Sequence, residues 1–192
     1  MGIIKKNKTF YFNVPGIELD GHQQDPQERF ALLFPFFKKY SNLSILDLGC
    51  AEGMLFNIFS NKIKIYHGFD KNEERVKLAQ NHLGLDKKNI FVKYFDFSMW
   101  EDFIEQNKDI LLCKYDLVIF FSVLHKMSSK VKILNKSLSM SKRFYAIRTK
   151  CSLFKRYNIK GRIEKMGFSQ IYKKRQLFNN KESYSAIFEK NE

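Results

Sequence analysis

Apolar and polar residues alternate along this chain in blocks that predict strands and helices in turn. Compact apolar runs predict strands, and apolar residues spaced three or four apart predict helices. The predicted strands cover residues 44–48, 63–69, 89–97, 115–124, 143–149, 169–178 and 183–190. The predicted helices between them cover residues 53–60, 70–85, 100–107, 128–140 and 158–168. Strands and helices that alternate at these lengths indicate a parallel sheet covered on both faces.

The two ends of the chain complete this pattern. Asp25-Pro26 predicts the start of a helix, and Pro35 should then kink or reset it. Only residues 179–182 separate the last two strands, which is too short for a crossover, so these strands should pair antiparallel. We therefore predict an α/β fold, a doubly wound, mostly parallel seven-stranded sheet with its last strand antiparallel. An arm and helix at 1–40 would precede the core at 41–192 in one globular domain.

Composition indicates a folded protein of the cytoplasm. The 192 residues suit one domain, and 44% apolar with 16% aromatic residues argue against disorder. No apolar run approaches the roughly 18 residues that cross a bilayer, and the first residues do not form a secretion signal. The three cysteines are too widely spaced for a disulfide framework or a zinc site. We expect no membrane span and no metal.

Positive charge is concentrated in the last third of the chain, within a formal net charge of +14. Residues 1–127 hold 17 basic and 16 acidic side chains, whereas residues 128–192 hold 17 basic and 4 acidic ones. Such a one-sided field favours a polyanionic partner or an anionic substrate. A solvated Lys-rich face is the other explanation, because lysine outnumbers arginine and base readout prefers arginine.

The stretch "ILDLGCAEGMLF" at 45–56 predicts a ligand-binding turn between the first core strand and its helix. Ligands of open α/β sheets lie beyond the carboxyl ends of the strands. The glycine spacing fits neither the dinucleotide fingerprint nor the phosphate loop. Asp47 and Glu52 flank the turn without a basic residue between them, so they should repel a pyrophosphate and favour an ammonium or sulfonium group.

Acidic residues also end the next two strands. Asp70 is placed to accept bonds from ribose hydroxyls, as acids do at this position in dinucleotide folds. Asp96 and Phe97 offer an acceptor and an aromatic face that suit adenine. A cationic amino-acid end, a ribose and an adenine together describe S-adenosyl-L-methionine.

The motifs "ILDLGCAEG", "GFD" at 68–70, "FDF" at 95–97 and "YDLVIFFSVLHKM" at 115–127 resemble the class I S-adenosylmethionine-dependent methyltransferases. The resemblance spans roughly residues 24–190 and implies a methyltransferase that releases S-adenosyl-L-homocysteine. It implies contacts to the methionine moiety from the loop residues Asp47, Gly49, Cys50, Ala51 and Gly53, with Cys50 a filler and not a nucleophile. It places Asp70 on the ribose, Asp96 and Phe97 on the adenine, and the residues from Phe121 through Ser122 to Val123 on the cofactor's other side. The upstream "QQDPQERF" suggests that Arg29 reaches the cofactor carboxylate.

The sequence departs from the family pattern at two places, Lys71 after the ribose acid and Lys126 after "LH". His125 is the candidate general base, because its ordinary pKa lies near neutrality, although it could equally cap the next helix or pack beside the cofactor. His22 in the arm is a candidate lid residue. Arg148 and Lys150 should rim the substrate side, either binding an anionic acceptor or standing solvated.

Three functions fit these residues. The first, which we favour, is methylation of a small molecule, a sugar or a lipid-linked acceptor. The second is methylation of RNA, in which the basic last third and the predicted loop at 149–157, "TKCSLFKRYN", would contact phosphates and stack on bases. The third is a non-catalytic cofactor-binding subunit of a methyltransferase complex, against which the intact loop argues mildly.

Overall fold

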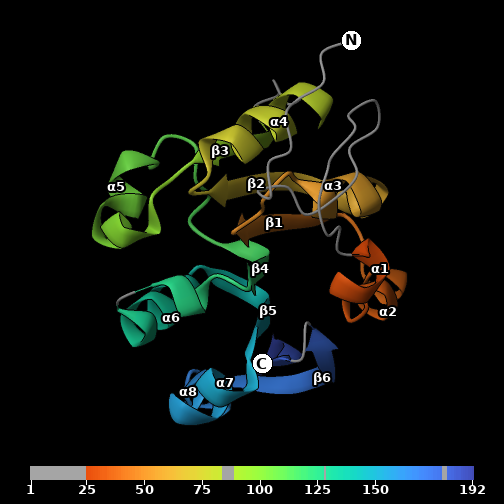
Figure 1. The fold of residues 1–192 in the computed structure, drawn as a ribbon, viewed down its shortest axis with the longest axis vertical. Coiled ribbons are helices and arrows are strands. Elements are labelled where there is room, and N and C mark those ends of the chain that lie inside the picture. The colour runs from red at the N-terminus through yellow and green to blue at the C-terminus, as the bar shows by residue number, and fades with distance from the viewer. Residues whose placement is uncertain (1–24, 84–88, 128, 179–180) are drawn as a thin grey trace.

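A computed structural model describes residues 25–83, 89–127, 129–178 and 181–192, which form a seven-stranded sheet between two layers of helices (Figure 1). The strands are β1 (Leu43–Leu48), β2 (Ile63–Asp70), β3 (Ile90–Tyr94), β4 (Tyr115–Phe121), β5 (Ser141–Lys150), β6 (Phe168–Phe178) and β7 (Lys181–Lys190). The α-helices are α1 (Pro26–Arg29), α2 (Leu33–Lys39), α3 (Met54–Phe59), α4 (Glu73–Leu83), α5 (Phe103–Gln106), α6 (Lys130–Ser139), α7 (Cys151–Arg156) and α8 (Ile159–Lys165). Three short 3-10 helices join them, η1 (Ser60–Lys62), η2 (Phe97–Asp102) and η3 (Leu124–Lys126).

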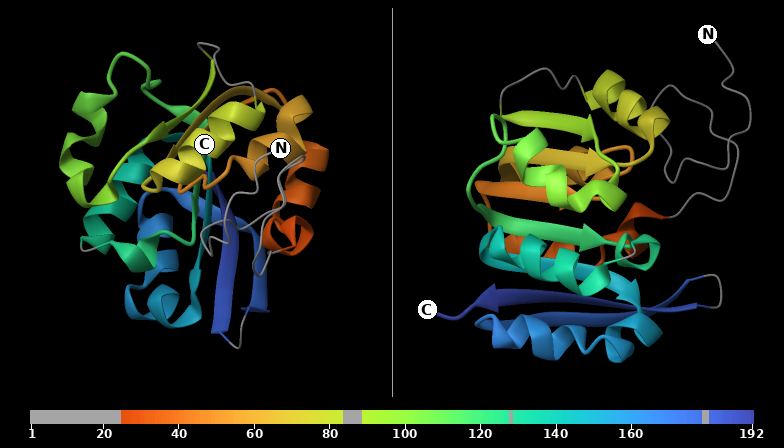
Figure 2. Two further views of the ribbon diagram at one scale, coloured as in Figure 1. Left: turned by 45° about the horizontal axis from the view of Figure 1, so that its top comes forward. Right: turned by 90° about the vertical axis from the view of Figure 1, so that its left-hand side faces the viewer.

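The strand order is β3-β2-β1-β4-β5-β7-β6. Strands β1 to β5 pair in parallel, and β7 pairs antiparallel with both β5 and β6. The right-hand view of Figure 2 shows the strands stacked in this order. The predicted fold, with its antiparallel last strand, is therefore confirmed. The winding direction reverses between β1 and β4, so a ligand is expected beyond the carboxyl ends of these two strands.

Each face of the sheet has its own apolar core. One core joins β1, β2, β4 and β5 to helices α2 to α4 and to the segment between α1 and α2. The other joins the sheet to η2 and helices α5 to α8. Figure 1 shows α1, α2 and α3 on one side of the sheet and α5 to α8 on the other. The central strand β4 is buried along nearly its whole length, as its apolar run "YDLVIFF" predicts.

The first two helices begin and end as the sequence predicts. The Asp25 carboxylate accepts a hydrogen bond from the Gln27 amide at 2.8 Å, which caps α1. The helix stops at Arg29, and α2 restarts with Pro35 inside its first turn, where proline is tolerated. Phe36 and Phe37 of α2 are buried against the sheet. None of the described helices is long and apolar enough to cross a membrane.

The structure corrects three predicted elements. The segment 149–157, predicted as a loop, is the end of β5 followed by α7, in which Phe154 is buried and lies 4.2 Å from the ring of Tyr184. Strand β4 ends at Phe121 instead of residue 124, because Ser122 takes a left-handed φ of 59° and η3 follows. The predicted helix at 100–107 is η2 and then α5.

Candidate functional site

The turn between β1 and α3 doubles back sharply over the end of the sheet. Gly49, Ala51 and Gly53 have φ values of 91°, 51° and 73°, all in the left-handed region. The amides of Gly49 and Cys50 both donate to the Phe69 carbonyl of β2, at 2.7 and 3.1 Å. Alternate left-handed residues hold the turn close to the carboxyl edge of the sheet, where the predicted ligand would lie.

The two glycines are required by close packing as well as by conformation. A Cβ on Gly49 would lie 2.0 Å from Val123 Cγ2, in the segment after β4. A Cβ on Gly53 would lie 2.5 Å from Leu83 Cδ1 at the end of α4. The turn is therefore wedged between the segment after β4 and helix α4, and a side chain at either glycine would displace it.

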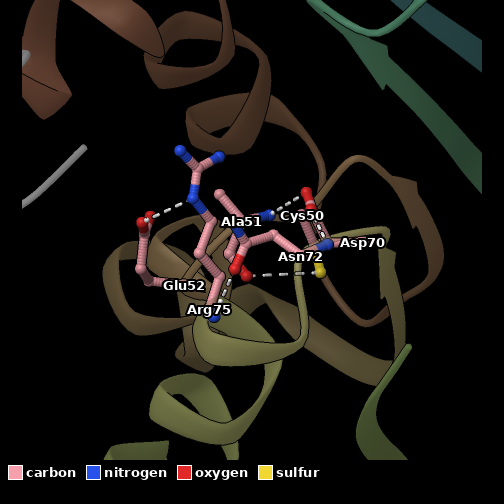
Figure 3. Close-up of polar contacts among 6 residues, drawn as sticks. All are labelled: Cys50, Ala51, Glu52, Asp70, Asn72 and Arg75. Atoms are coloured by element: carbon pink, nitrogen blue, oxygen red, sulfur yellow. Dashed lines mark hydrogen bonds and ion pairs between the residues drawn. The ribbon is translucent and has the colours of Figure 1, made fainter. Parts of the chain in front are cut away.

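Asp70 ties the turn after β1 to the turn after β2. Its Oδ2 accepts a hydrogen bond from the Ala51 amide and its Oδ1 accepts one from the Asn72 amide, both at 3.0 Å (Figure 3). Its side chain is buried. Each carboxylate oxygen has two acceptor sites, so Asp70 retains acceptor capacity for a ligand hydroxyl after these two bonds. Its predicted ribose contact stays a prediction.

Glu52 does not have the electrostatic role predicted for it. Its side chain is 0% exposed, and its Oε1 lies 3.4 Å from Nε of Arg75, itself buried on α4. In Figure 3 this ion pair lies on the other side of Ala51 from the Asp70 carboxylate. Because Arg75 balances the charge of Glu52, the expected repulsion of a diphosphate by this residue is wrong, and the argument for a cation rests on Asp47.

Asp47 is a buried acid near the end of β1. Tyr66 of β2 donates its hydroxyl proton to Oδ2 of Asp47 at 2.9 Å. Burial raises the pKa of Asp47 to about 7, with a further contribution from the charge of Asp70, while the Tyr66 bond and the charge of Arg29 act in the opposite direction. A buried carboxylate in this state would be stabilised by a cation, and it would disfavour an anion.

Arg29 and Arg148 lie together at the same end of the sheet. Both are buried, and Nη1 of Arg148 donates to the Arg29 carbonyl at 3.4 Å. Burial lowers the pKa of Arg148 to about 10, and the neighbouring charge of Arg29 lowers it further. Of the two alternatives predicted for Arg148, a solvated position is wrong, because the side chain is buried beneath the end of α1. Binding of an anionic acceptor stays a prediction. Lys150 is exposed, and its place on the substrate side stays a prediction.

The remaining predicted residues surround this centre at differing depths. Cys50 is buried, and burial raises its thiol pKa well above the ordinary value, which agrees with a filler. Phe121 is buried and stacks on Phe30 at 6.3 Å, so its ring belongs to the core. Ser122 donates its amide to the Arg148 carbonyl at 2.8 Å, and His125 lies in η3, partly exposed.

The predicted adenine pair has structural contacts of its own. The Asp96 carboxylate accepts from the Ser98 amide at 2.9 Å, which caps η2 and lowers the Asp96 pKa. Phe97 is buried and stacks on Trp100 at 6.3 Å. Its ring therefore packs within the apolar core that joins the sheet to η2 and helices α5 to α8. His22, the predicted lid residue, lies outside the described residues.

Sequence reasoning missed Tyr66 and Arg75, the partners of Asp47 and Glu52. Tyr66 pairs with Ile45 in the register of β1 and β2, and so points to the same face of the sheet as Asp47. That register cannot be read from either strand alone. Arg75 lies in the first turn of α4, and its contact with Glu52 likewise depends on how that helix packs against the glycine turn.

Comparisons with known proteins agree with this geometry. A family model described as "Methyltransferase domain" matches residues 39–189. No curated protein matches the sequence. The solved structure of magnesium protoporphyrin IX methyltransferase from Synechocystis PCC 6803 with bound SAM is similar, with a TM-score of 0.68, 17% identity, and coverage of 86% of this chain and 79% of that one.

Two further solved structures share the fold. The N-methyltransferase NodS from Bradyrhizobium japonicum WM9, in complex with S-adenosyl-L-homocysteine, gives a TM-score of 0.66 at 13% identity and covers 88% of this chain and 90% of its own. PH1948 from Pyrococcus horikoshii, a candidate RNA methyltransferase, gives a TM-score of 0.67 at 16% identity. The match covers 98% of this chain and 92% of that one. Since the family model spans most of the chain, this protein belongs to the methyltransferase domain family, as its motifs predicted.

Proposed function

We propose that this protein transfers a methyl group from S-adenosyl-L-methionine to a small molecule, a sugar or a lipid-linked acceptor, releasing S-adenosyl-L-homocysteine. The observation that supports it most is the buried carboxylate of Asp47 beneath the glycine turn, with Asp70 at the next strand end. This arrangement favours a ligand with a cationic end and hydroxyl groups, and it disfavours a diphosphate.

The residues present fit the proposed donor. Asp47 would attract its ammonium group, the buried cation of Arg29 beside it would attract its carboxylate, and Asp70 would accept bonds from its ribose. Gly49 fits this arrangement because the space that a Cβ would need is filled by Val123 Cγ2, so a larger residue would displace the turn. When bound, S-adenosylmethionine supplies an electrophilic methyl group on a sulfonium.

The contribution of the chain is mainly positional. In-line displacement is fast when nucleophile, carbon and sulfur are held collinear, and the buried turn would fix one end of that line. His125, partly exposed at the end of β4, would accept a proton from an acceptor whose nucleophile must lose one. An acceptor that is already deprotonated would not need this base.

A small acceptor agrees better than RNA with the segment at 149–157. That segment was expected to present aromatic residues for base stacking, but Phe154 is buried against Tyr184 and Tyr157 is half-buried. Because neither ring is fully exposed, that segment offers little of the stacking contribution of roughly 1–3 kcal/mol per base.

RNA remains the second candidate because of one specific surface. Helices α7 and α8 expose five basic side chains and one acid, Glu164, which pairs with Lys160 at 3.4 Å. The exposed basic residues are Lys155, Arg156, Lys160, Arg162 and Lys165. Turnover by the isolated chain would exclude the third possibility, a non-catalytic partner subunit.

Replacing Asp70 should weaken the binding of S-adenosylhomocysteine. In Asp70→Ala we expect at least a tenfold loss of affinity by calorimetry, about 1.4 kcal/mol, the order of one charge-assisted hydrogen bond. Asp116→Ala is the matched control, since Asp116 also accepts two hydrogen bonds, both from Ser44, at the opposite end of the sheet. Equal losses in the two variants would contradict a ligand role.

The same variant separates ribose contact from support of the turn. The wild type should bind a 2′-deoxy analogue of S-adenosylhomocysteine more weakly than the parent compound. Asp70→Ala should bind the two compounds equally, because the acceptor for the hydroxyl is gone. If the variant still discriminates between them, Asp70 acts only through its bonds to Ala51 and Asn72.

The small-molecule proposal also predicts weak, non-specific binding of RNA. A bulk tRNA probe should bind with Kd of about 10⁻⁴ to 10⁻⁶ M at physiological salt and should receive no labelled methyl group. The low-molecular-mass fraction of a cell extract should receive it. Tight binding and methylation of the tRNA, abolished in Lys155→Glu/Arg156→Glu but retained in the exposed α4 control Lys77→Glu, would favour the RNA alternative.

A further inference from the structure

Arg148 is a buried cation that forms no ion pair with the described residues, although the charge of exposed Glu28 in α1 acts on it from farther away. Its side chain is 4% exposed, and no carboxylate of the described residues lies within ion-pair distance of its guanidinium. Its contact with protein acceptors is one long hydrogen bond from Nη1 to the Arg29 carbonyl, and its Nε has no acceptor among the described residues. Buried charges in proteins are normally paired, since an isolated one is expensive to desolvate.

A second unpartnered donor lies next to it on the neighbouring strand. Ser185 of β7 is 2% exposed, and its Oγ has no hydrogen-bond partner among the described residues. Arg148 and Ser185 are directly paired in the antiparallel register of β5 and β7, so their side chains leave the same face of the sheet as close neighbours. These two neighbouring buried donors both lack an acceptor, and a single acceptor group could serve both.

The next residue along β5 shows that the two neighbouring unpartnered donors lie on one face of the sheet. Thr149 Oγ1 is also buried and unpartnered among the described residues, but Thr149 follows Arg148 directly in β5 and so points to the opposite face. It does not contribute to the pair. The face shared by Arg148 and Ser185 is the one on which Phe121 packs against Phe30 of the N-terminal helical region.

We propose that Arg148 and Ser185 form a subsite for an anionic group, a carboxylate or a phosphate, of the methyl acceptor. This inference rests on the proposed methyltransferase function and gives its acceptor a chemical class. An anion here would accept from Nε of Arg148 and from the Ser185 hydroxyl, and it would offset the repulsion between Arg148 and Arg29.

The strand order assigns this subsite to the acceptor and not to the donor. The donor is expected over the reversal between β1 and β4, and Arg29 is the arginine whose charge acts on Asp47 there. Strands β5 and β7 lie two and three positions from β1, which is about 10 and 14 Å at the usual spacing. Burial of both donors also favours a small anion over the phosphates of a polymer, which bind at exposed surfaces.

The Nε–Hε signals of the arginines in NMR spectra test this subsite directly. They can be told apart because the chain has only seven arginines. The Arg148 signal is assigned by its loss in Arg148→Lys. With saturating S-adenosylhomocysteine, acetate and inorganic phosphate are added in turn at constant ionic strength against chloride. We expect a saturable shift of the Arg148 signal, at least fivefold weaker apparent binding in Ser185→Ala, and no saturable shift of exposed Arg143, which pairs with Glu189.

A stability measurement tests the uncompensated charge independently. Arg148→Met keeps an unbranched apolar stem and removes the charged guanidinium, so we expect the melting temperature of the ligand-free protein to rise by several degrees. Arg148→Met should also lose any stabilisation that phosphate gives the wild type. The control Arg143→Met should keep that stabilisation. A lower melting temperature for Arg148→Met, or an Arg148 signal indifferent to both anions, would overturn the subsite.

Cofactor binding distinguishes failure of the inference from failure of the proposed function. If the subsite serves the acceptor, Arg148→Met binds S-adenosylhomocysteine within threefold of the wild type. A different result would be that S-adenosylhomocysteine alone shifts the Arg148 signal and binds equally more weakly to Arg148→Met and to Arg29→Met. The anion at this place would then be the donor's carboxylate. The inference is then wrong and the proposed function stands. No binding of S-adenosylhomocysteine at all would overturn the proposed function and, with it, the assignment to an acceptor.

Discussion

Gly49→Ala is expected to destabilise the protein by roughly 3 kcal/mol and to abolish binding of S-adenosylhomocysteine at micromolar concentrations. The new methyl group would lie 2.0 Å from Val123 Cγ2, which is overpacking that costs about 1–3 kcal/mol. The φ of 91° adds about 1–2 kcal/mol of backbone strain for a residue with a Cβ. Urea denaturation measures the loss of stability, and calorimetry measures the loss of S-adenosylhomocysteine binding.

Gly167→Ala is the matched control for this variant. Gly167 has a similar φ of 83°, but a Cβ there would meet nothing within 4 Å, so it should show the backbone strain alone. Adding Val123→Ala to Gly49→Ala should restore the packing part of the loss and leave the strain. If Gly49→Ala and Gly167→Ala lose equal stability, the turn yields to the methyl group and is not wedged against the segment after β4.

Local sequence patterns predicted the strands and the turn because these features depend on neighbouring residues. The run "ILDLG" ends a buried strand at a residue that must adopt positive φ, and only a glycine permits this beside Val123. Asp70 was identified for the same reason, since it ends its strand and caps the following turn at Asn72. Pattern and position were enough for both residues.

Roles that depend on distant partners were not predictable. Glu52 was expected to face the ligand, but Arg75 from α4 neutralises it, and nothing in the turn itself indicates this ion pair. Solvation was one of two alternatives for Arg148 because it is near a strand end, whereas α1, more than a hundred residues earlier, covers it. The helix α7 was missed because Lys150-Cys151 has no proline, glycine or strong cap to announce its start.

Asp47 gives the second large effect, a pH dependence of cofactor affinity. Its pKa in the ligand-free protein is raised to about 7 from an ordinary value of 3.8, mainly by burial. Ionisation of Asp47 therefore destabilises the fold. The cost is absent below about pH 4, grows as the pH rises, and reaches roughly 4 kcal/mol of unfolding free energy at pH 7. An ammonium group bound beside Asp47 would lower that pKa and remove part of the cost.

The affinity for S-adenosylhomocysteine should consequently fall as the pH falls, because binding must then displace the proton on Asp47. From pH 7 to pH 5 we expect a loss approaching a hundredfold, about tenfold for each unit. Proton release on binding, measured by calorimetry at pH 6 in two buffers of different ionisation heat, should approach one proton per site.

Asp47→Asn is the control, because an amide oxygen can still accept the Tyr66 hydroxyl while the charge is absent. This variant should melt several degrees higher than the wild type at pH 8 in the ligand-free state. It should bind S-adenosylhomocysteine weakly and with little dependence on pH between 5 and 7. An unchanged pH profile in Asp47→Asn would assign the proton to another group and remove the main support for a cationic ligand at this turn. Binding by the wild type that is independent of pH would do the same.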